Sequence, residues 1–312
     1  MEAIFVTVIP VFAIIALGYG VARKGLFPKD GEKGLHTFVF VYAIPALLFR
    51  TMTRIDVAQS APWALWGAYF LAAAVVWVAA ILASKRLASI APAGGASAAI
   101  GASFGNLVML GIPLSVSHFG EAAALPAGLL VSIHAPVHWL AATLRAEWSG
   151  RGAGKPFGDV LRELLTGLAR NPIIVALLAG LAWNFTGLGL HPVVDRTIGL
   201  LGQAGVPAAL FALGLSLAGY GFKGNVRGVT VILVLKMLAF PLIAWVLAYE
   251  VFALPPLDAA IVVLFAALPP GANAYLFAAR YNAAVAPVSG AIAIGTLISI
   301  VTVSAVLWMS AI

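Results

Sequence analysis

Apolar stretches long enough to cross a lipid bilayer follow one another along nearly the whole chain. A transmembrane helix needs roughly 20 consecutive, mostly apolar residues. Ten such stretches occur, and short loops between them hold most of the charged residues. Inside lipid the backbone must satisfy its own hydrogen bonds, so stretches of this length fold as helices. The sequence therefore predicts an all-α polytopic membrane protein.

The ten predicted transmembrane helices are similar in length. They cover residues 3–22, 34–53, 63–84, 97–118, 122–144, 171–188, 197–219, 228–250, 257–279 and 286–310. The first resembles a signal peptide in length, but Glu2 precedes it and Arg23 and Lys24 follow it. Because a signal peptide has its positive charge in front, we expect this helix to belong to the mature protein.

The composition excludes several classes of function. Of the 312 residues, 62% are hydrophobic and 9% are charged, whereas about 25% are charged in a typical soluble domain. The chain has no cysteine, which excludes disulfides, a thiol nucleophile and a thiolate metal site. The net charge of +7 lies in short loops between apolar stretches. It therefore indicates membrane topology rather than a nucleic-acid partner.

The positions of Lys and Arg predict the orientation. Arg50, Arg54 and Arg196 lie on one side of the membrane in the ten-helix arrangement, and Lys236 lies inside a helix. All the other Lys and Arg residues follow the first, third, fifth, seventh and ninth helices. Since basic loops stay in the cytoplasm, both termini should face outward from the cytoplasmic (inner) membrane.

The two halves of the chain resemble each other. At an offset of 162 residues, Pro10 falls on Pro172, Gly18 on Gly180, and the segment 44–49 on 206–211 with its proline aligned. Five helices in each copy would insert the second copy with the opposite orientation, as in many secondary transporters. We therefore expect a first repeat over 1–145, a cytoplasmic linker over 146–170 and a second repeat over 171–312.

The fourth and ninth predicted helices carry residues that interrupt helices. The fourth contains GNLVMLGIP (Gly105–Pro113), and the ninth contains ALPPGAN (Ala267–Asn273). Proline removes a backbone donor and glycine permits unusual backbone angles. Such breaks survive at membrane depth only when they are buried in protein or line a watery cavity. We expect both helices to be discontinuous and to cross near the middle of the membrane, with their positive half-helix ends favouring an anion.

Three segments identify a resemblance to a known family. FVYAIPALLF (Phe40–Phe49), ASFGNLVMLGIPL (Ala102–Leu114) and ALPPGANAYLFAARYN (Ala267–Asn282) resemble the signature segments of the auxin efflux carrier family. That family includes the plant PIN-formed carriers and the bacterial malonate-type permeases. Where the plant carriers have Pro-Asn, this chain has Gly105-Asn106, and it lacks the long cytoplasmic loop of many plant members. The resemblance therefore favours a bacterial-type permease for an organic acid.

The resemblance implies a ten-helix fold similar to that of the bile-acid/sodium symporters. Helices one, two, six and seven would form a scaffold, and helices three to five and eight to ten a moving transport unit. A homodimer formed through the scaffold is a further expectation.

The candidate substrate-binding residues lie around the two breaks. Asn106 and Asn273 offer amide donors and acceptors beside the half-helix ends, and Ser103 offers a hydroxyl. The other candidates shape the backbone of the breaks: Gly105, Pro113, Pro269, Pro270 and Gly271. No Asp or Glu lies near the middle of a predicted helix, which fits an anionic or neutral substrate.

Four further polar residues lie inside predicted helices. Lys236 is about nine residues into the eighth helix, roughly 13 Å deep, and either provides a countercharge or extends toward the cytoplasmic face. His134 and His138 share one face of the fifth helix and form either a proton relay or a packed, hydrogen-bonded pair. Gln203 precedes a proline in the seventh helix and is a weaker candidate for substrate contact.

Two short motifs resemble those of enzymes. Gly101–Gly105 matches G-x-S-x-G, and His134–His138 has the histidine spacing of a zincin with alanine in place of the catalytic Glu. The first motif acts on a strand-to-helix turn with acid and histidine partners, but here it lies in a membrane helix. We therefore expect neither an enzyme nor a bound metal.

These observations predict a secondary transporter of a small organic anion, a mono- or dicarboxylate of the malonate or auxin kind. The alternatives are an anion channel or facilitator with a fixed pore, and a sodium-coupled symporter of larger organic anions. No cofactor is expected besides a coupling ion, which is either Na⁺ or H⁺ unless transport is by uniport. The partners are the substrate and the lipid bilayer.

Overall fold

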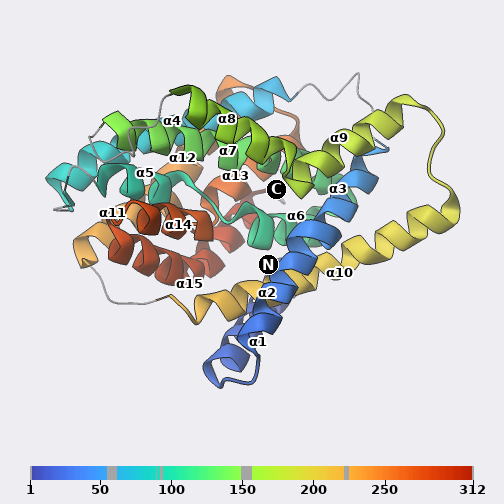
Figure 1. The fold of residues 1–312 in the computed structure, drawn as a ribbon, viewed down its shortest axis with the longest axis horizontal. Coiled ribbons are helices and arrows are strands. Elements are labelled where there is room, and N and C mark those ends of the chain that lie inside the picture. Colours follow the sequence, from blue (N-terminus) through green and yellow to red (C-terminus); the bar gives the residue numbers. More distant parts are fainter. Residues whose placement is uncertain are drawn as a thin grey trace. The chain divides into compact units, whose positions relative to one another are not determined.

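The computed structural model describes residues 2–54, 62–88, 90–91, 94–148, 157–220 and 225–310, and these residues are almost entirely helical (Figure 1). The α-helices are α1 (Glu2–Arg23), α2 (Lys29–Thr37), α3 (Ile44–Met52), α4 (Trp63–Arg86), α5 (Gly95–Ser103), α6 (Ile112–Phe119), α7 (Ala124–Trp148), α8 (Phe157–Ala169), α9 (Pro172–Phe185), α10 (Pro192–Leu217), α11 (Val226–Val234), α12 (Phe240–Trp245), α13 (Pro256–Ala267), α14 (Ala272–Arg280) and α15 (Val285–Ser310). A 3₁₀ turn over Glu121–Ala123 precedes α7.

Many of these helices suit a bilayer. Within the described residues, six continuous helical segments are long and apolar enough to cross a membrane: Asp30–Met52, Trp63–Arg86, Glu121–Ala146, Pro192–Leu217, Val226–Val251 and Val285–Met309. Shorter apolar helices cover Val8–Arg23, Leu107–Phe119, Pro172–Phe185 and Pro256–Ala267. The described residues thus confirm the predicted all-α fold and contain helices whose length and composition suit a membrane.

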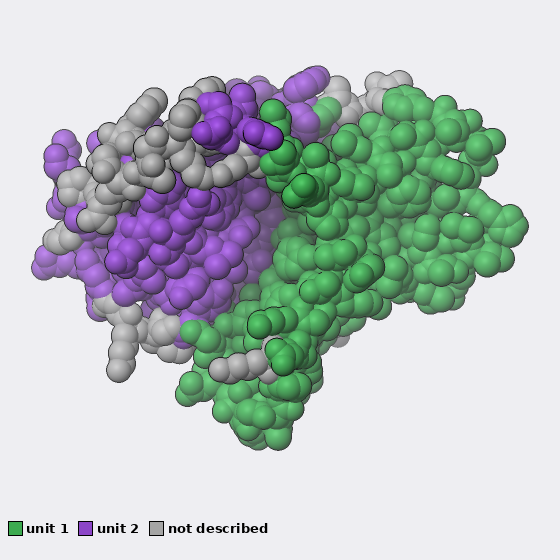
Figure 2. Space-filling view, viewed as in Figure 1, with its two compact units in different colours: residues 1–62, 108–132, 165–219 green, residues 63–107, 133–164, 220–312 purple. Residues whose placement is uncertain are grey.

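The chain divides into two compact units, which Figure 2 distinguishes by colour. Unit 1 contains residues 1–62, 108–132 and 165–219, and unit 2 contains residues 63–107, 133–164 and 220–312. Each unit therefore takes residues from both halves of the sequence, and the chain passes from one unit to the other between Leu107 and Val108.

Glycines allow close helix packing in unit 1, where α1 contacts α10 and α3 contacts α9. A Cβ built at Gly18 would lie 2.3 Å from the carbonyl oxygen of Phe211. A Cβ built at Gly180 would lie 2.6 Å from the carbonyl oxygen of Phe49. No side chain larger than hydrogen fits at either contact, as is common where membrane helices approach closely. The two contacts involve residues that match at the offset of 162.

Three prolines in helical segments follow a widened, π-helical turn. These turns cover Phe38–Ala43, Leu107–Gly111 and Leu235–Ala239, and the next helix has Pro45, Pro113 or Pro241 as its second residue. A proline ring clashes with the carbonyl four residues earlier, and a π-turn relieves such a clash without ending the helix. A further π-helical turn covers Val246–Val251.

Several helix boundaries differ by a few residues from the sequence-based expectation, and one helix was not expected. The helix expected from residue 197 begins at Pro192, because proline suits the first helical position and the His191 side chain accepts a hydrogen bond from the Val193 N–H. Part of the expected linker, residues 157–169, forms α8, which was not predicted. Residues 149–156 of that linker lie outside the described residues.

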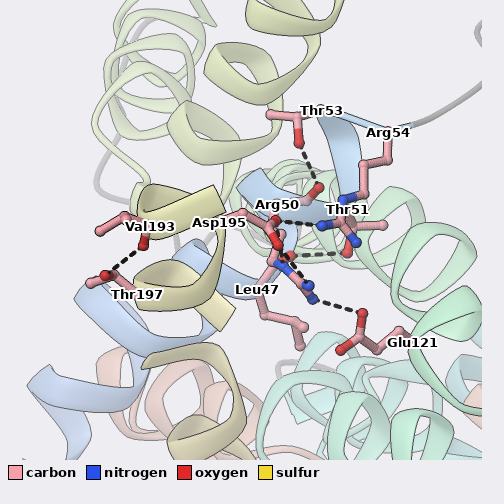
Figure 3. Close-up of polar contacts among 9 residues, drawn as sticks. All are labelled: Leu47, Arg50, Thr51, Thr53, Arg54, Glu121, Val193, Asp195 and Thr197. Carbon is pink, nitrogen blue, oxygen red and sulfur yellow. Dashed lines mark hydrogen bonds and ion pairs between the residues drawn. The ribbon is translucent and has the colours of Figure 1, made fainter. Parts of the chain in front are cut away.

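An ion-pair network joins three segments of unit 1 (Figure 3). Arg50 donates to Asp195 through Nε at 2.9 Å and through Nη2 at 3.2 Å, and to Glu121 through Nη1 at 2.7 Å. Arg54 donates to the same carboxylate of Asp195. The network thus connects the end of α3, the first turn of α10 and the turn that precedes α7.

Candidate functional site

The helix predicted over residues 97–118 is interrupted after Ser103. Phe104 has φ −81° and ψ 108°, which is extended backbone. Helical structure resumes as the π-turn at Leu107, after Gly105 and Asn106. The Phe104 N–H still donates to the Ile100 carbonyl at 2.8 Å, but the extended backbone at Phe104 ends the regular helical hydrogen bonding there.

The helix predicted over residues 257–279 is interrupted in the same way. α13 ends at Ala267, and Leu268 is extended, with φ −65° and ψ 152°. Pro269 and Pro270 have no N–H to donate. Gly271 is also extended, with φ −85° and ψ 159°, and α14 begins at the next residue.

The two interruptions pair with each other inside unit 2. The Asn106 N–H donates to the Pro269 carbonyl at 3.0 Å, and the Gly271 N–H donates to the Phe104 carbonyl at 3.0 Å. Gly105 and Pro270 consequently form an isolated antiparallel bridge. Each interruption thus satisfies polar groups that the other leaves exposed, as buried backbone requires.

Close approach at the pair requires glycine. A Cβ built at Gly271 would lie 2.9 Å from the Gly105 carbonyl oxygen and 3.0 Å from the Phe104 ring. A Cβ built at Gly105 would lie 3.2 Å from the Phe265 carbonyl oxygen and 3.4 Å from Lys236 Nζ. The short sequence Gly-Asn opposite Pro-Pro-Gly therefore lets two backbones meet without side chains between them.

The pair leaves donors available at the start of α14. The Ala274 N–H donates to the Gly271 carbonyl at 3.0 Å, whereas the N–H groups of Ala272 and Asn273 have no carbonyl one helical turn behind them. Within the described residues, the side-chain amides of Asn106 and Asn273 make no hydrogen bond, and both residues are half-buried. These groups suit an anion, because a helix N-terminus carries partial positive charge.

Comparison with known proteins places this chain in a family. Residues 3–308 match the family described as "Membrane transport protein". The chain belongs to this family. The chain is 28% identical to a "Putative malonate transporter" of Rhizobium meliloti, over 97% of this chain and 94% of that protein. It is 25% identical to the "Uncharacterized transporter YfdV" of Escherichia coli K12, over 96% and 95%. It is 29% identical to "Auxin efflux carrier component 3a" of Oryza sativa, over 58% and 32%.

The resemblance to the auxin efflux carrier family is thereby confirmed for this membrane transport protein. The family and its relatives are described as transporters, which do not form an enzyme class. Ser103, the centre of the enzyme-like motif, lies in the last turn of α5, and its hydroxyl donates to the Ala99 carbonyl at 2.8 Å. The hydroxyl is buried and serves its own helix.

His134 and His138 belong to unit 2 and lie beside the first interruption. The His134 ring centroid is 4.3 Å from that of Phe104 and 4.4 Å from that of His138. Since a carbonyl oxygen only accepts, His138 Nδ1 donates to the His134 carbonyl at 2.8 Å. Neither ring nitrogen of His134 has a hydrogen-bond partner among the described residues. The Tyr69 ring contacts the His134 ring, and the Tyr69 hydroxyl likewise has no partner among these residues.

The remaining candidates divide between the units. Asn106, Asn273 and Lys236 belong to unit 2, as do the residues of both interruptions. Pro113 and Gln203 belong to unit 1, where Pro113 is buried in the first turn of α6 and Gln203 is exposed on α10.

Sequence reasoning missed two residues that contact this site in the membrane transport protein. Thr302 Oγ1 donates to the carbonyl of Ala267 at 3.2 Å, and Tyr69 is completely buried beside His134. Both are ordinary polar residues in apolar helices, so no local pattern distinguishes them.

Proposed function

We propose that the chain is a secondary transporter that binds a small organic anion at the paired interruptions of unit 2 and moves it by alternating access. The observation that carries the proposal is the reciprocal hydrogen bonding of residues 104–106 with residues 269–271. This pairing leaves the N–H groups at the start of α14 and two amide side chains without partners among the described residues.

A carboxylate is the substrate group that these donors suit best. Helix N-termini and amide N–H groups bind anions through directed hydrogen bonds. Within the described residues there is no cluster of three His, Asp or Glu side chains that could hold a metal ion. Two relatives carry the names of carboxylic acids, malonate and auxin, and we extend that substrate class to this chain.

The proposed architecture is ten helices in two inverted repeats. Gly18 packs on the Phe211 carbonyl and Gly180 on the Phe49 carbonyl, and both members of each contact match at the offset of 162. A repeat with inverted topology supports alternating access, because each half can take the conformation of the other. Of the ten predicted transmembrane helices, the first, second, sixth and seventh would then form the scaffold, and the other six the moving unit.

The proposed location is the cytoplasmic membrane with both termini outside. It is supported by the concentration of Lys and Arg in alternate loops. With this orientation the Arg50 network faces outward.

Transport by purified protein in liposomes tests the proposal. A labelled dicarboxylate such as malonate should enter vesicles faster when unlabelled malonate is trapped inside. Such counterflow supports a carrier, whereas a conductance without stimulation by internal substrate supports a channel. Imposed Na⁺, H⁺ or voltage gradients identify the coupling ion, and dependence on Na⁺ with a preference for larger anions would favour the symporter alternative.

Variants at the interruptions link transport to the site. Asn106→Ala and Asn273→Ala should each lower uptake at least about tenfold, since a hydrogen bond to a charged group contributes roughly 1.5–3 kcal/mol. Ser304→Ala is a control of the same kind, because the half-buried Ser304 hydroxyl donates to the Ile300 carbonyl of its own helix, away from both interruptions. If both asparagine variants transport as fast as the control, the site is elsewhere.

A further inference from the structure

Lys236 is completely buried in the middle of a membrane-length segment. It lies in the π-helical turn Leu235–Ala239, between α11 and α12. Its Nζ donates to the Ala266 carbonyl at 2.7 Å and lies 4.5 Å from the centroid of the Phe240 ring. The side chain therefore reaches a neighbouring helix, α13. It does not extend toward the cytoplasmic face, which was one of the two expectations from the sequence.

The acceptor of Lys236 is at a helix end. Ala266 is the next-to-last residue of α13, and the carbonyls of a last helical turn have no partner within their own helix. The next carbonyl, that of Ala267, accepts from Thr302 Oγ1 of α15 at 3.2 Å. Side chains from two flanking segments thus cap the interrupted end of α13, where an unpaired carbonyl would be costly in lipid.

Lys236 also lies beside the opposite interruption. A Cβ built at Gly105 would lie 3.4 Å from Nζ and 3.2 Å from the carbonyl oxygen of Phe265. The lysine terminus therefore fills the space between the end of α13 and the extended residues that follow α5.

We propose that Lys236 is a positioning residue that caps α13 and fixes the paired interruptions, and that it is not a countercharge for the substrate. The proposal rests on the proposed function, in which those interruptions form the substrate site. A hydrogen on Nζ is required for the cap, and both the ammonium and the neutral amine carry one. The substrate's own charge should then be recognised by amide donors alone.

Three substitutions separate capping from charge. Lys236→Met keeps most of the length and removes the donor, Lys236→Gln keeps a donor without the charge, and Lys236→Arg keeps both donor and charge. Hydrogen exchange of peptides from residues 256–280 measures the cap without any substrate, and uptake of malonate and of acetate measures the effect on anions of different charge.

Capping predicts that Lys236→Met raises exchange at residues 266–274 about tenfold or more, because a buried acceptor loses its partner. The ratio of malonate to acetate uptake should stay within about twofold of the ratio for the natural protein. Exchange in Lys236→Arg should be as slow as in the natural protein. Lys236→Gln should lie between the two, and it decides the question if Lys236→Met does not fold.

Unchanged exchange in Lys236→Met, or in Lys236→Gln when Lys236→Met does not fold, would overturn the proposal. So would a selective rise in the KM for malonate in Lys236→Gln with slow exchange preserved, because that result indicates a countercharge. The exchange result stands even if the natural protein transports neither anion. Failure of the proposed function is therefore distinguishable from failure of this inference.

Discussion

Replacing Gly271 by alanine tests whether the two interruptions must stay in contact. Gly271 has φ −85°, so alanine adopts its backbone conformation without strain. The new methyl group, however, would lie 2.9 Å from the Gly105 carbonyl oxygen and 3.0 Å from the Phe104 ring. The carbonyl is part of the paired backbone and cannot turn aside as a flexible side chain does.

The cost follows from these contacts. Relief of the overlap requires the backbones to separate by a few tenths of an ångström, and overpacking of this kind costs about 1–3 kcal/mol. If the loaded site needs the paired geometry, that free energy is lost from substrate binding. Since about 1.4 kcal/mol corresponds to a tenfold change, the KM for uptake should rise by roughly 5- to 150-fold.

Counterflow in proteoliposomes measures this KM, and Gly95→Ala is the control. Gly95 lies in α5, the helix that leads into the first interruption, and a Cβ there would meet only Ser84 Oγ at an ordinary 3.7 Å. The reasoning is wrong if Gly271→Ala keeps the natural KM within twofold, or if Gly95→Ala is impaired to the same degree.

Two further predictions concern the stability of unit 1 and are checked by thermal unfolding in detergent. Gly180→Ala should lower the Tm, because its Cβ would lie 2.6 Å from a backbone oxygen and overpacking of about 1–3 kcal/mol exceeds the ~1 kcal/mol of helix propensity gained. Gly20→Ala, with nothing within 4 Å of its Cβ, should leave the Tm unchanged or raise it, and equal losses for both variants would contradict the packing argument. Asp195→Asn should lower the Tm more than Glu121→Gln, because Asp195 serves two arginines and its side chain is 21% exposed, against 52% for Glu121. Equal shifts would contradict this ranking, and an unchanged Tm in both variants would indicate that the network does not stabilise the unit.

The sequence was sufficient to predict both interruptions. Pro269 and Pro270 lack a backbone N–H, and Gly105 and Gly271 permit backbone angles that other residues avoid. A continuous apolar helix has no use for such residues at its centre. The match of Gly18 with Gly180 was also informative, because each of these residues meets a carbonyl that a larger side chain would block.

Other features depend on tertiary contacts that local patterns do not encode. The partner of Lys236 is a carbonyl thirty positions later, and nothing around Lys236 indicates it. The start of α10 was placed too late because Asp195 and Arg196 are typical of a loop, whereas Pro192 begins the helix. The π-turns before Pro45, Pro113 and Pro241 are a local response to proline that helix-length arguments overlook.

Protection of a single introduced cysteine tests the central claim most directly, because the natural chain has no cysteine. Ala272→Cys places a thiol at the exposed first residue of α14, and Ala279→Cys places one at an exposed position near the other end of the same helix. Saturating malonate should slow maleimide labelling at position 272 and leave labelling at position 279 unchanged. Equal labelling at position 272 with and without a transported anion would contradict a substrate site at the paired interruptions.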